Sequence, residues 1–376
     1  MISTGTAELP NVFDFDAKAL SDYFAERGEK PFRATQVIKW VHQHGVSDFA
    51  QMSNLSLALR SELAANMSFS LPEVVSEQIS HDGTRKWMLH VAGGQAIETV
   101  YIPEVDRGTL CVSSQVGCPL ECSFCATGKQ GFSRNLTAAE IIGQLWIAAR
   151  ALGQFPRPEK RPISNVVFMG MGEPLLNFDN VLRAIELMLD DNAYGLSRRR
   201  VTVSTAGLVP QMDKLKQASP VSLAVSLHAP NDTLRNELVP LNRTYPLAEL
   251  LPACKRFAQD YTHESITFEY TMLDGVNDTP AHARELVRVL EGIPSKVNLI
   301  PWNPFEGGNY RRSTTESIER FRTILQKAGL ITLMRKTRGD DIDAACGQLV
   351  GNVKARAARF QRGVEKPAST ARGASL

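Results

Sequence analysis

Apolar runs that read as strands alternate with amphipathic segments that read as helices between residues 105 and 345. The predicted strands are Leu110–Val116, Asn165–Met169, Val201–Thr205, Val221–Leu227, Ile266–Met272, Val297–Pro301 and, after a last helix, Ile331–Thr337. The predicted helices span 138–152, 178–189, 210–217, 247–261, 281–291 and 315–328. This alternation predicts an α/β fold with a parallel sheet and right-handed crossovers. Six strand–helix units favour a partial (β/α)6 barrel over a closed barrel of eight, which takes about 250 residues.

A doubly wound open sheet is the alternative architecture, but no G-x-G-x-x-G motif follows the first predicted strand. Two smaller units come before the barrel core, which is predicted at 105–350. Residues 1–73 predict a helical accessory unit, in which Pro31 is placed to open a helix. Residues 74–104 predict a β-hairpin with a turn at Asp82-Gly83. Residues 351–376 are rich in Lys and Arg and predict a flexible basic tail.

Composition narrows the class of protein. The chain has 376 residues, 43% of them hydrophobic and 22% charged, which is typical of a soluble globular protein of two or three domains. No run approaches the roughly 20 apolar residues of a membrane span, and the N-terminus does not resemble a secretory signal. We therefore expect a cytoplasmic protein, whose six cysteines serve metal binding or catalysis rather than disulfides. A net charge of +2 neither requires nor excludes nucleic acid.

Three cysteines stand close together, Cys118, Cys122 and Cys125, at the spacing C-x3-C-x2-C. Three thiolates on one loop predict a [4Fe-4S] cluster whose fourth iron stays open, because soft sulfur suits such clusters. A zinc site would need a fourth ligand, and none lies nearby in the sequence. Zinc with a remote ligand and incidental thiols are the alternatives. With an apolar strand leading into it, the loop resembles that of the radical S-adenosylmethionine (SAM) enzymes, in which SAM binds the open iron.

Polar residues follow the predicted strands at one rim of the barrel. Gly172 lets the backbone approach a ligand closely, and Glu173 is suited to pair with an ammonium group. An ordinary tight turn is the alternative explanation of this pair. Further candidates for the ribose and adenine edges of SAM are Ser204, Ser226, Leu227, His228 and Asn303. Each of these residues is weak evidence of a SAM site when taken alone, since hydroxyls at strand ends often form hydrogen bonds with the local backbone.

Two thiols lie outside the cluster motif. Cys346 follows three aspartates, which would raise the pKa of its thiol. A nearby helix N-terminus or cation would reverse this effect, and Arg335, Lys336 and Arg338 are close in the sequence. Cys111 precedes Cys118 by seven residues. Two such thiols at the rim of a SAM site suggest a transient disulfide, although the sequence does not show that they meet. An idle structural thiol is the alternative.

Long motifs carry a closer resemblance. The segments Cys111–Cys118, Met169–Leu175, Ser226–Asn231, Asn298–Pro304 and Arg335–Cys346, together with the cysteine triad, are similar in sequence and order to the dual-specificity RNA adenine-C2 methyltransferases of the RlmN family. The resemblance spans about residues 10–360. It implies one [4Fe-4S] cluster per chain and two SAM molecules per turnover. The implied substrates are an adenine in the peptidyl-transferase centre of 23S rRNA and the adenine 3′ of the tRNA anticodon.

The resemblance also implies a mechanism. Cys346 takes a methyl group from one SAM as a thiolate nucleophile. A second SAM yields a 5′-deoxyadenosyl radical, which abstracts hydrogen from the S-methyl group, and the carbon radical adds to C2. Glu98 removes the C2 proton, and Cys111 then attacks the sulfur of Cys346, so that a disulfide forms and methylated RNA leaves. An electron donor such as flavodoxin or ferredoxin and a dithiol reductant are implied, for a monomer that binds no membrane.

The helical unit resembles the RNA-docking domain of this family, and Arg198–Arg200 and Arg311–Arg312 are candidates for phosphate contacts. A solvated charged face is the alternative for both runs. Two rival functions stay open. An adenine-C8 rRNA methyltransferase would carry the same cysteines. A non-catalytic, metal-bearing RNA-binding module would need neither Cys346 nor Cys111.

Overall fold

The computed structural model of the chain describes residues 9–219, 221–259 and 265–351. Residues 352–376 of the predicted basic tail lie outside the described residues, as do the last two residues of the helix predicted at 247–261. No helix in the described ranges is long and apolar enough to cross a membrane.

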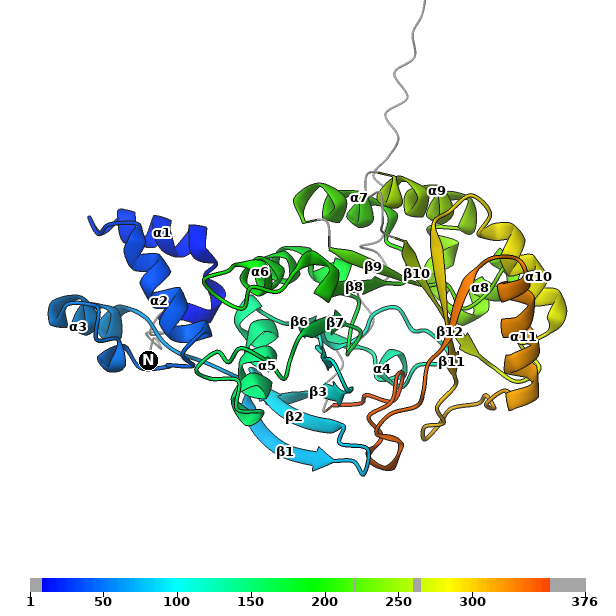
Figure 1. Cartoon of the computed structure of the whole chain (residues 1–376), viewed down its shortest axis with the longest axis horizontal. Helices are drawn as coiled ribbons and strands as arrows, with labels where there is room; N and C mark the ends of the chain where they lie inside the picture. The colour runs from blue at the N-terminus through cyan, green and yellow to red at the C-terminus, as the bar shows by residue number, and fades with distance from the viewer. Residues whose placement is uncertain (1–8, 220, 260–264, 352–376) are drawn as a thin grey trace, which may run out of the picture.

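Seven parallel strands form the barrel, and each lies beside the next in chain order (Figure 1). They are β4 (Gly108–Cys111), β7 (Asn165–Phe168), β8 (Val201–Thr205), β9 (Ser222–Ser226), β10 (Ile266–Met272), β11 (Ser295–Pro301) and β12 (Ile331–Met334). The helices between them are α5 (Ala138–Ala151), α6 (Phe178–Leu189), α7 (Val209–Ala218), α9 (Leu247–Ala258), α10 (Pro280–Val289) and α11 (Thr315–Lys327). The predicted α/β partial barrel is confirmed.

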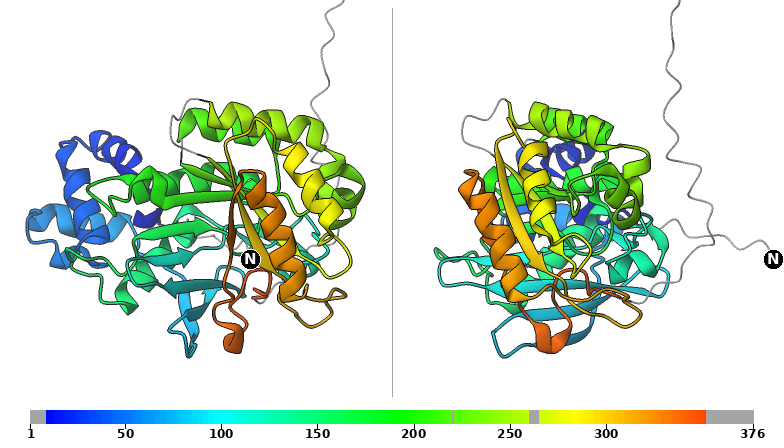
Figure 2. Two further views of the ribbon diagram at one scale, coloured as in Figure 1. Left: turned by 45° about the vertical axis from the view of Figure 1, so that its right-hand side comes forward. Right: turned by 90° about the vertical axis from the view of Figure 1, so that its right-hand side faces the viewer.

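The barrel stays open in the described residues. β4 pairs on its outer edge with an antiparallel strand rather than with β12, so the sheet continues beyond the barrel into antiparallel strands (Figure 2). These are β1 (Glu73–Ile79), β2 (Arg85–Val91) and β3 (Gln95–Pro103). The residues of β1 are all exposed, whereas most of β3 is buried. Because β3 pairs with β4, the hairpin region and the barrel share one sheet of ten strands.

The predicted strand Leu110–Val116 is broken in the structure. β4 ends at Cys111, and β5 (Gln115–Gly117) pairs instead with β6 (Phe132–Asn135) in a separate two-stranded sheet. The physical reason is a side chain from α5: the backbone N–H of Ser113 donates to Gln144 Oε1 at 2.7 Å, which takes it out of the ladder. The sequence reading also missed two short helices, α4 (Ala126–Lys129) and α8 (Asp232–Leu238).

The N-terminal helices pack at one end of the molecule, beside α5 and α6 (Figure 1). They are α1 (Ala17–Ala25), α2 (Phe32–His42) and α3 (Leu57–Asn66). Two hydrogen bonds fix the junction with α5: Trp146 Nε1 donates to the carbonyl of Val41 at 3.0 Å, and Asp14 accepts from Ala139 N–H at 2.8 Å. These contacts hold the helical unit against the barrel.

Candidate active site

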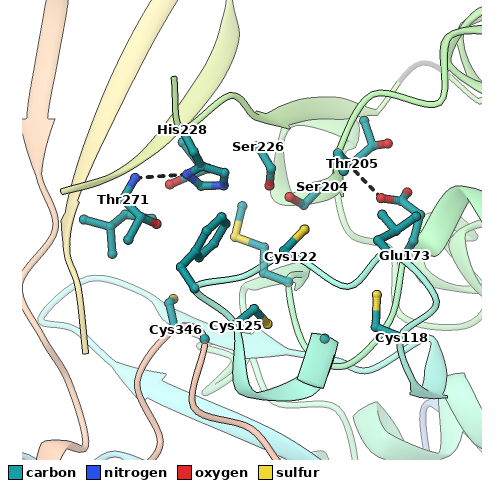
Figure 3. Close-up of a pocket in the computed structure, with 18 of the residues that line it drawn as sticks. Cys118, Cys122, Cys125, Glu173, Ser204, Thr205, Ser226, His228, Thr271 and Cys346 are labelled. Atoms are coloured by element: carbon teal, nitrogen blue, oxygen red, sulfur yellow. Dashed lines mark hydrogen bonds between the residues drawn. The ribbon is translucent and has the colours of Figure 1, made fainter. Parts of the chain in front are cut away.

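One cavity lies where the barrel strands end, the usual position of active sites in this architecture. It measures about 950 Å³, including its open mouth. Figure 3 shows the thiols facing the polar strand ends across this space. The predicted site residues that line it are Cys118, Cys122, Cys125, Gly172, Glu173, Ser204, Ser226, His228 and Cys346. Leu227, Asn303, Glu98 and Cys111 do not line it, and each is located below.

The cysteine loop is held in place by residues from distant parts of the chain. Trp302, at the end of β11, donates its indole N–H to the carbonyl of Phe124 at 3.0 Å. The hydroxyls of Ser123 and Tyr310 lie 2.8 Å apart. The backbone N–H of Ala126 donates to the carbonyl of Gly347 at 2.8 Å. The last bond ties the start of α4 to the segment that carries Cys346.

The three loop thiols are half-buried and border the cavity. Burial is the main cause that raises the pKa of all three thiols, so the apoprotein holds them protonated until a metal displaces the protons. Among the described residues, no three His, Cys, Asp or Glu side chains converge as ligands of a single ion. The donor set fits a [4Fe-4S] cluster with SAM: soft thiols line one side, and the hydroxyls of Ser204 and Ser226 line the other.

The turn after β7 needs glycine at its centre. Gly172 has φ +99°, and a Cβ atom there would lie 2.5 Å from the Cβ of Gln115. Glu173 is buried, and its carboxylate accepts backbone N–H bonds from Leu175 at 3.1 Å and Ala206 at 2.8 Å. Burial raises the pKa of Glu173 to about 7, and these hydrogen bonds oppose the rise. The carboxylate therefore joins the ends of β7 and β8.

A buried arginine fixes the ends of β8 and β9. Arg235, on α8, donates to the backbone carbonyls of Leu227 at 3.1 Å, Ser226 at 3.0 Å and Ala206 at 2.6 Å. Leu227 is itself fully buried, so its contribution to the site is its backbone. The guanidinium thus holds the strand ends that present Ser226 to the cavity.

His228 is neutral and fixed. Its Nδ1 accepts the backbone N–H of Thr271 at 3.0 Å, and its ring centroid lies 4.5 Å from that of Phe124. Burial, assisted by the nearby charge of Arg235, lowers the pKa of His228 to about 3. The imidazole therefore offers the cavity an uncharged, flat surface beside the cysteine loop (Figure 3).

Cys111 and Cys346 come from opposite ends of the barrel sequence and interact electrostatically with each other and with Arg335. Cys111 is buried at the end of β4. Burial, and secondarily the thiol of Cys346, raise the pKa of Cys111 to about 12, whereas Arg335 lowers it. The pKa of Arg335 is raised, and the largest cause is its electrostatic interaction with Cys346. Arg335, one of three cations that the sequence placed near Cys346, lines the same cavity as that cysteine.

Two predicted site residues lie beside the cavity rather than in its wall. Asn303 donates its side-chain amide to the backbone carbonyl of Cys346 at 3.1 Å. Glu98 is only 2% exposed on β3, where its carboxylate contacts Lys86 and the backbone N–H of Val350. The direct SAM contact predicted for Asn303 and the role predicted for Glu98 stay predictions.

Sequence reasoning missed several polar residues of this region, namely Lys86, Arg235, Glu269 and Thr271. Glu269 carried a usable signal, because a carboxylate in the middle of a central strand such as β10 is unusual. One oxygen of Glu269 accepts from Asn298 at 2.9 Å, and the other is buried without a partner. Arg235 carried no such signal, since an arginine on a short helix is ordinarily solvated.

Comparisons with known proteins agree with this geometry. Residues 10–68 match the ribosomal RNA large subunit methyltransferase N-terminal domain, and residues 112–287 match the radical SAM superfamily. The crystal structure of a radical SAM methyltransferase from Sphaerobacter thermophilus is 43% identical, with a TM-score of 0.84 over 90% of this chain and 99% of that one.

Two further structures are much less similar. A domain of pyruvate-formate lyase-activating enzyme from Bacteroides vulgatus is 18% identical, covering 46% of this chain and 99% of that one, with a TM-score of 0.34. SuiB of Streptococcus suis bound to SAM is 13% identical, covering 61% and 50%, with a TM-score of 0.44. The two domain matches and the Sphaerobacter structure are sufficient: the chain belongs to the RlmN family of radical SAM methyltransferases.

Proposed function

We propose that this enzyme methylates C2 of one adenine in the peptidyl-transferase centre of 23S rRNA and of the adenine 3′ of the tRNA anticodon. The family implies a [4Fe-4S] cluster, SAM and an RNA substrate. The observation that carries the proposal is the grouping of Cys111, Cys346 and Arg335 beside the three-cysteine cavity. Two thiols next to one cation support methyl transfer through a protein sulfur, which suits an adenine carbon too electron-poor to attack SAM directly.

Cys118, Cys122 and Cys125 would hold one cluster per chain. With two SAM molecules per turnover, this cofactor set would supply a methyl group and a 5′-deoxyadenosyl radical. Cys346 acts first as the methyl acceptor. Its thiolate forms a bond to the SAM methyl carbon while the bond from that carbon to the sulfonium sulfur breaks. Arg335 lines the same cavity as Cys346 and brings a cation close to the methyl acceptor.

Glu98 and Cys111 complete the reaction after the methyl carbon has joined C2. The Glu98 carboxylate accepts the proton from C2. Once the unpaired electron left by radical addition has passed back to the oxidised electron donor, the adenine is joined to Cys346 through a thioether. Cys111 then attacks the sulfur of Cys346, which forms a disulfide and breaks the sulfur–carbon bond, and the proton of the Cys111 thiol goes to the leaving carbon, which becomes the methyl group of the base. A dithiol reductant restores both thiols, and flavodoxin or ferredoxin supplies the electron that cleaves SAM.

We divide the chain into a helical unit of residues 1–73, a hairpin of residues 74–104 and a core of residues 105–350. The helical unit is assigned to RNA docking. Of the two arginine runs, Arg311–Arg312 is the better phosphate contact. It follows β11 at the cavity end of the barrel, and Arg311 is 84% exposed although paired with Asp274. Arg198–Arg200 comes just before β8, at the opposite end of the strands.

The test is an anaerobic reaction of the reconstituted enzyme with SAM, a reductant and protein-free 23S rRNA or tRNA that lacks the modification. The RNA is digested to nucleosides and compared with standards by mass spectrometry. We expect 2-methyladenosine from both RNAs. The rival C8 assignment predicts 8-methyladenosine instead, and a non-catalytic RNA-binding module predicts neither product and no cleavage of SAM.

A further inference from the structure

Glu98, the proposed proton acceptor, is enclosed by two partners. Its Oε1 lies 3.2 Å from Lys86 Nζ, and its Oε2 accepts the backbone N–H of Val350 at 3.0 Å. Lys86 is on β2 and Glu98 on β3, where the register pairs Lys86 with Val100 and Met88 with Glu98. The two charged side chains are therefore diagonal neighbours on one face of the sheet, at a separation that long side chains can bridge.

The environment of Lys86 is unusual for a lysine. Its side chain is 9% exposed and that of Glu98 only 2%, whereas lysine is almost never buried unless paired. Losing one partner of a buried ion pair is costly, because the other charge is left without compensation. The ion pair with Lys86 therefore holds the Glu98 carboxylate in one position on the sheet.

The same ammonium group also reaches the segment that carries the methyl acceptor. Lys86 Nζ donates to the backbone carbonyl of Asp343 at 3.3 Å. Asp343 has φ +49°, in the left-handed region, and stands three residues before Cys346. Lys86 thus joins the proposed base to the chain segment whose sulfur holds the substrate.

We propose that Lys86 is a positioning residue that keeps the carboxylate of Glu98 aligned with the Cys346 segment. This inference rests on the proposed role of Glu98. The other charged or titratable groups on the strands that pair with β3 are Arg85 and His90 on β2 and Cys111 on β4.

The test compares Lys86→Met, which removes the charge, with Lys86→Arg, which keeps it, and with Glu98→Gln. Lys327→Met is the matched control, because Lys327 is an exposed lysine at the end of α11. Enzyme already methylated at Cys346 is mixed anaerobically with labelled RNA, SAM and a one-electron reductant, and the covalent protein–RNA adduct is followed on denaturing gels. SAM binding and methylation of Cys346 are measured on the same preparations.

For Lys86→Met we expect adduct formation at the wild-type rate and resolution about tenfold slower, because a carboxylate that is no longer held in place is aligned with the C2 proton less often. Lys86→Arg should restore the rate of resolution, and Lys327→Met should match wild type.

Resolution of the adduct by Lys86→Met at the wild-type rate would overturn the inference. So would an equal loss of SAM binding, Cys346 methylation and resolution, because that pattern indicates a structural role only. If wild-type enzyme and Glu98→Gln both form no adduct, the proposed function itself fails, whatever Lys86 does.

Discussion

The side-chain amide of Asn303 donates a hydrogen bond of 3.1 Å to the backbone carbonyl of Cys346. Asn303 stands just after β11, and Cys346 lies in a segment without regular structure after β12. The bonds that tie this segment to the cysteine loop and to the end of β11 also include Ala126 N–H to Gly347 O, the Thr127 hydroxyl to Leu349 O, and the Gln348 amide to Pro304 O. The position of the Cys346 sulfur therefore depends on the cysteine loop and on the end of β11.

Replacing Asn303 with Ala removes one of these bonds. A single hydrogen bond contributes about 1 kcal/mol, so local opening of the segment should become about fivefold more frequent. Backbone hydrogen exchange across residues 343–350 measures this opening by mass spectrometry. Asn66→Ala, on the exposed end of α3, is the control and should leave that exchange unchanged. Unaltered exchange in Asn303→Ala would show that the bond does not hold the segment.

Arg235→Met should destabilise the protein and weaken its binding of SAM. The substitution leaves the carbonyls of Ala206, Ser226 and Leu227 buried without their donor, which costs about 3 kcal/mol or more in the free energy of unfolding. Denaturant titration gives the stability, and equilibrium dialysis gives the affinity for SAM. Arg243→Met changes an exposed arginine nearby and should alter neither. Wild-type SAM affinity in Arg235→Met would show that this arginine does not support the binding of SAM.

The barrel was predictable because its strands end where apolar runs end. β8 and β10 match their predicted limits residue for residue, since each is an unbroken run of alternating or fully buried positions. The break after β4 was not predictable, because Gln144 takes the N–H of Ser113 from 31 residues away. The helix α8 was missed because it has only seven residues, started by an Asn231 cap.

The candidate site likewise contains residues that the sequence could predict and residues that it could not. Cys118, Cys122 and Cys125 stand out locally, as no packing requirement explains thiols at that spacing. Lys86 looks like an ordinary charged residue in a strand until tertiary structure places Glu98 and Asp343 around it. Partners that meet only through folding leave no local pattern in the sequence.

His42 should make the protein less stable in mild acid. It is buried where the helical unit meets the barrel, 3.3 Å from the hydroxyl of Tyr194, and burial lowers its pKa from 6.5 to about 3. Below pH 6.5 the unfolded chain binds a proton that the folded chain does not, so this contribution to stability is complete above pH 6.5 and falls as pH falls toward 3. The loss should reach about 1.4 kcal/mol at pH 5.5.

Denaturant titrations at several pH values measure this effect as the difference between wild type and His42→Gln. The variant should lose less stability than wild type between pH 7 and about 5.5. His228, whose pKa is also lowered, adds the same pH dependence to both proteins and cancels in the difference. His90→Gln replaces an exposed histidine and serves as the control. Identical pH dependence in wild type and His42→Gln would contradict the prediction.

Cys346→Ala should abolish product formation while keeping the cofactor site. The cluster ligands are three other cysteines, so iron content and SAM affinity should stay at wild-type levels, whereas no methylated adenosine should appear. Iron analysis, dialysis with labelled SAM and nucleoside mass spectrometry give the three readings. Cys254→Ala changes a buried thiol of α9 and should keep its activity. Methylated RNA from Cys346→Ala would exclude a methyl carrier at this residue.

The most direct test of the two-thiol mechanism is the fate of labelled RNA in Cys111→Ala. Without the resolving thiol, the bond between the methylated adenine and the Cys346 sulfur has nothing to break it. We predict a protein–RNA adduct that survives denaturing electrophoresis and maps to Cys346 by mass spectrometry. Release of free methylated RNA at the wild-type rate would contradict the assigned roles of both cysteines.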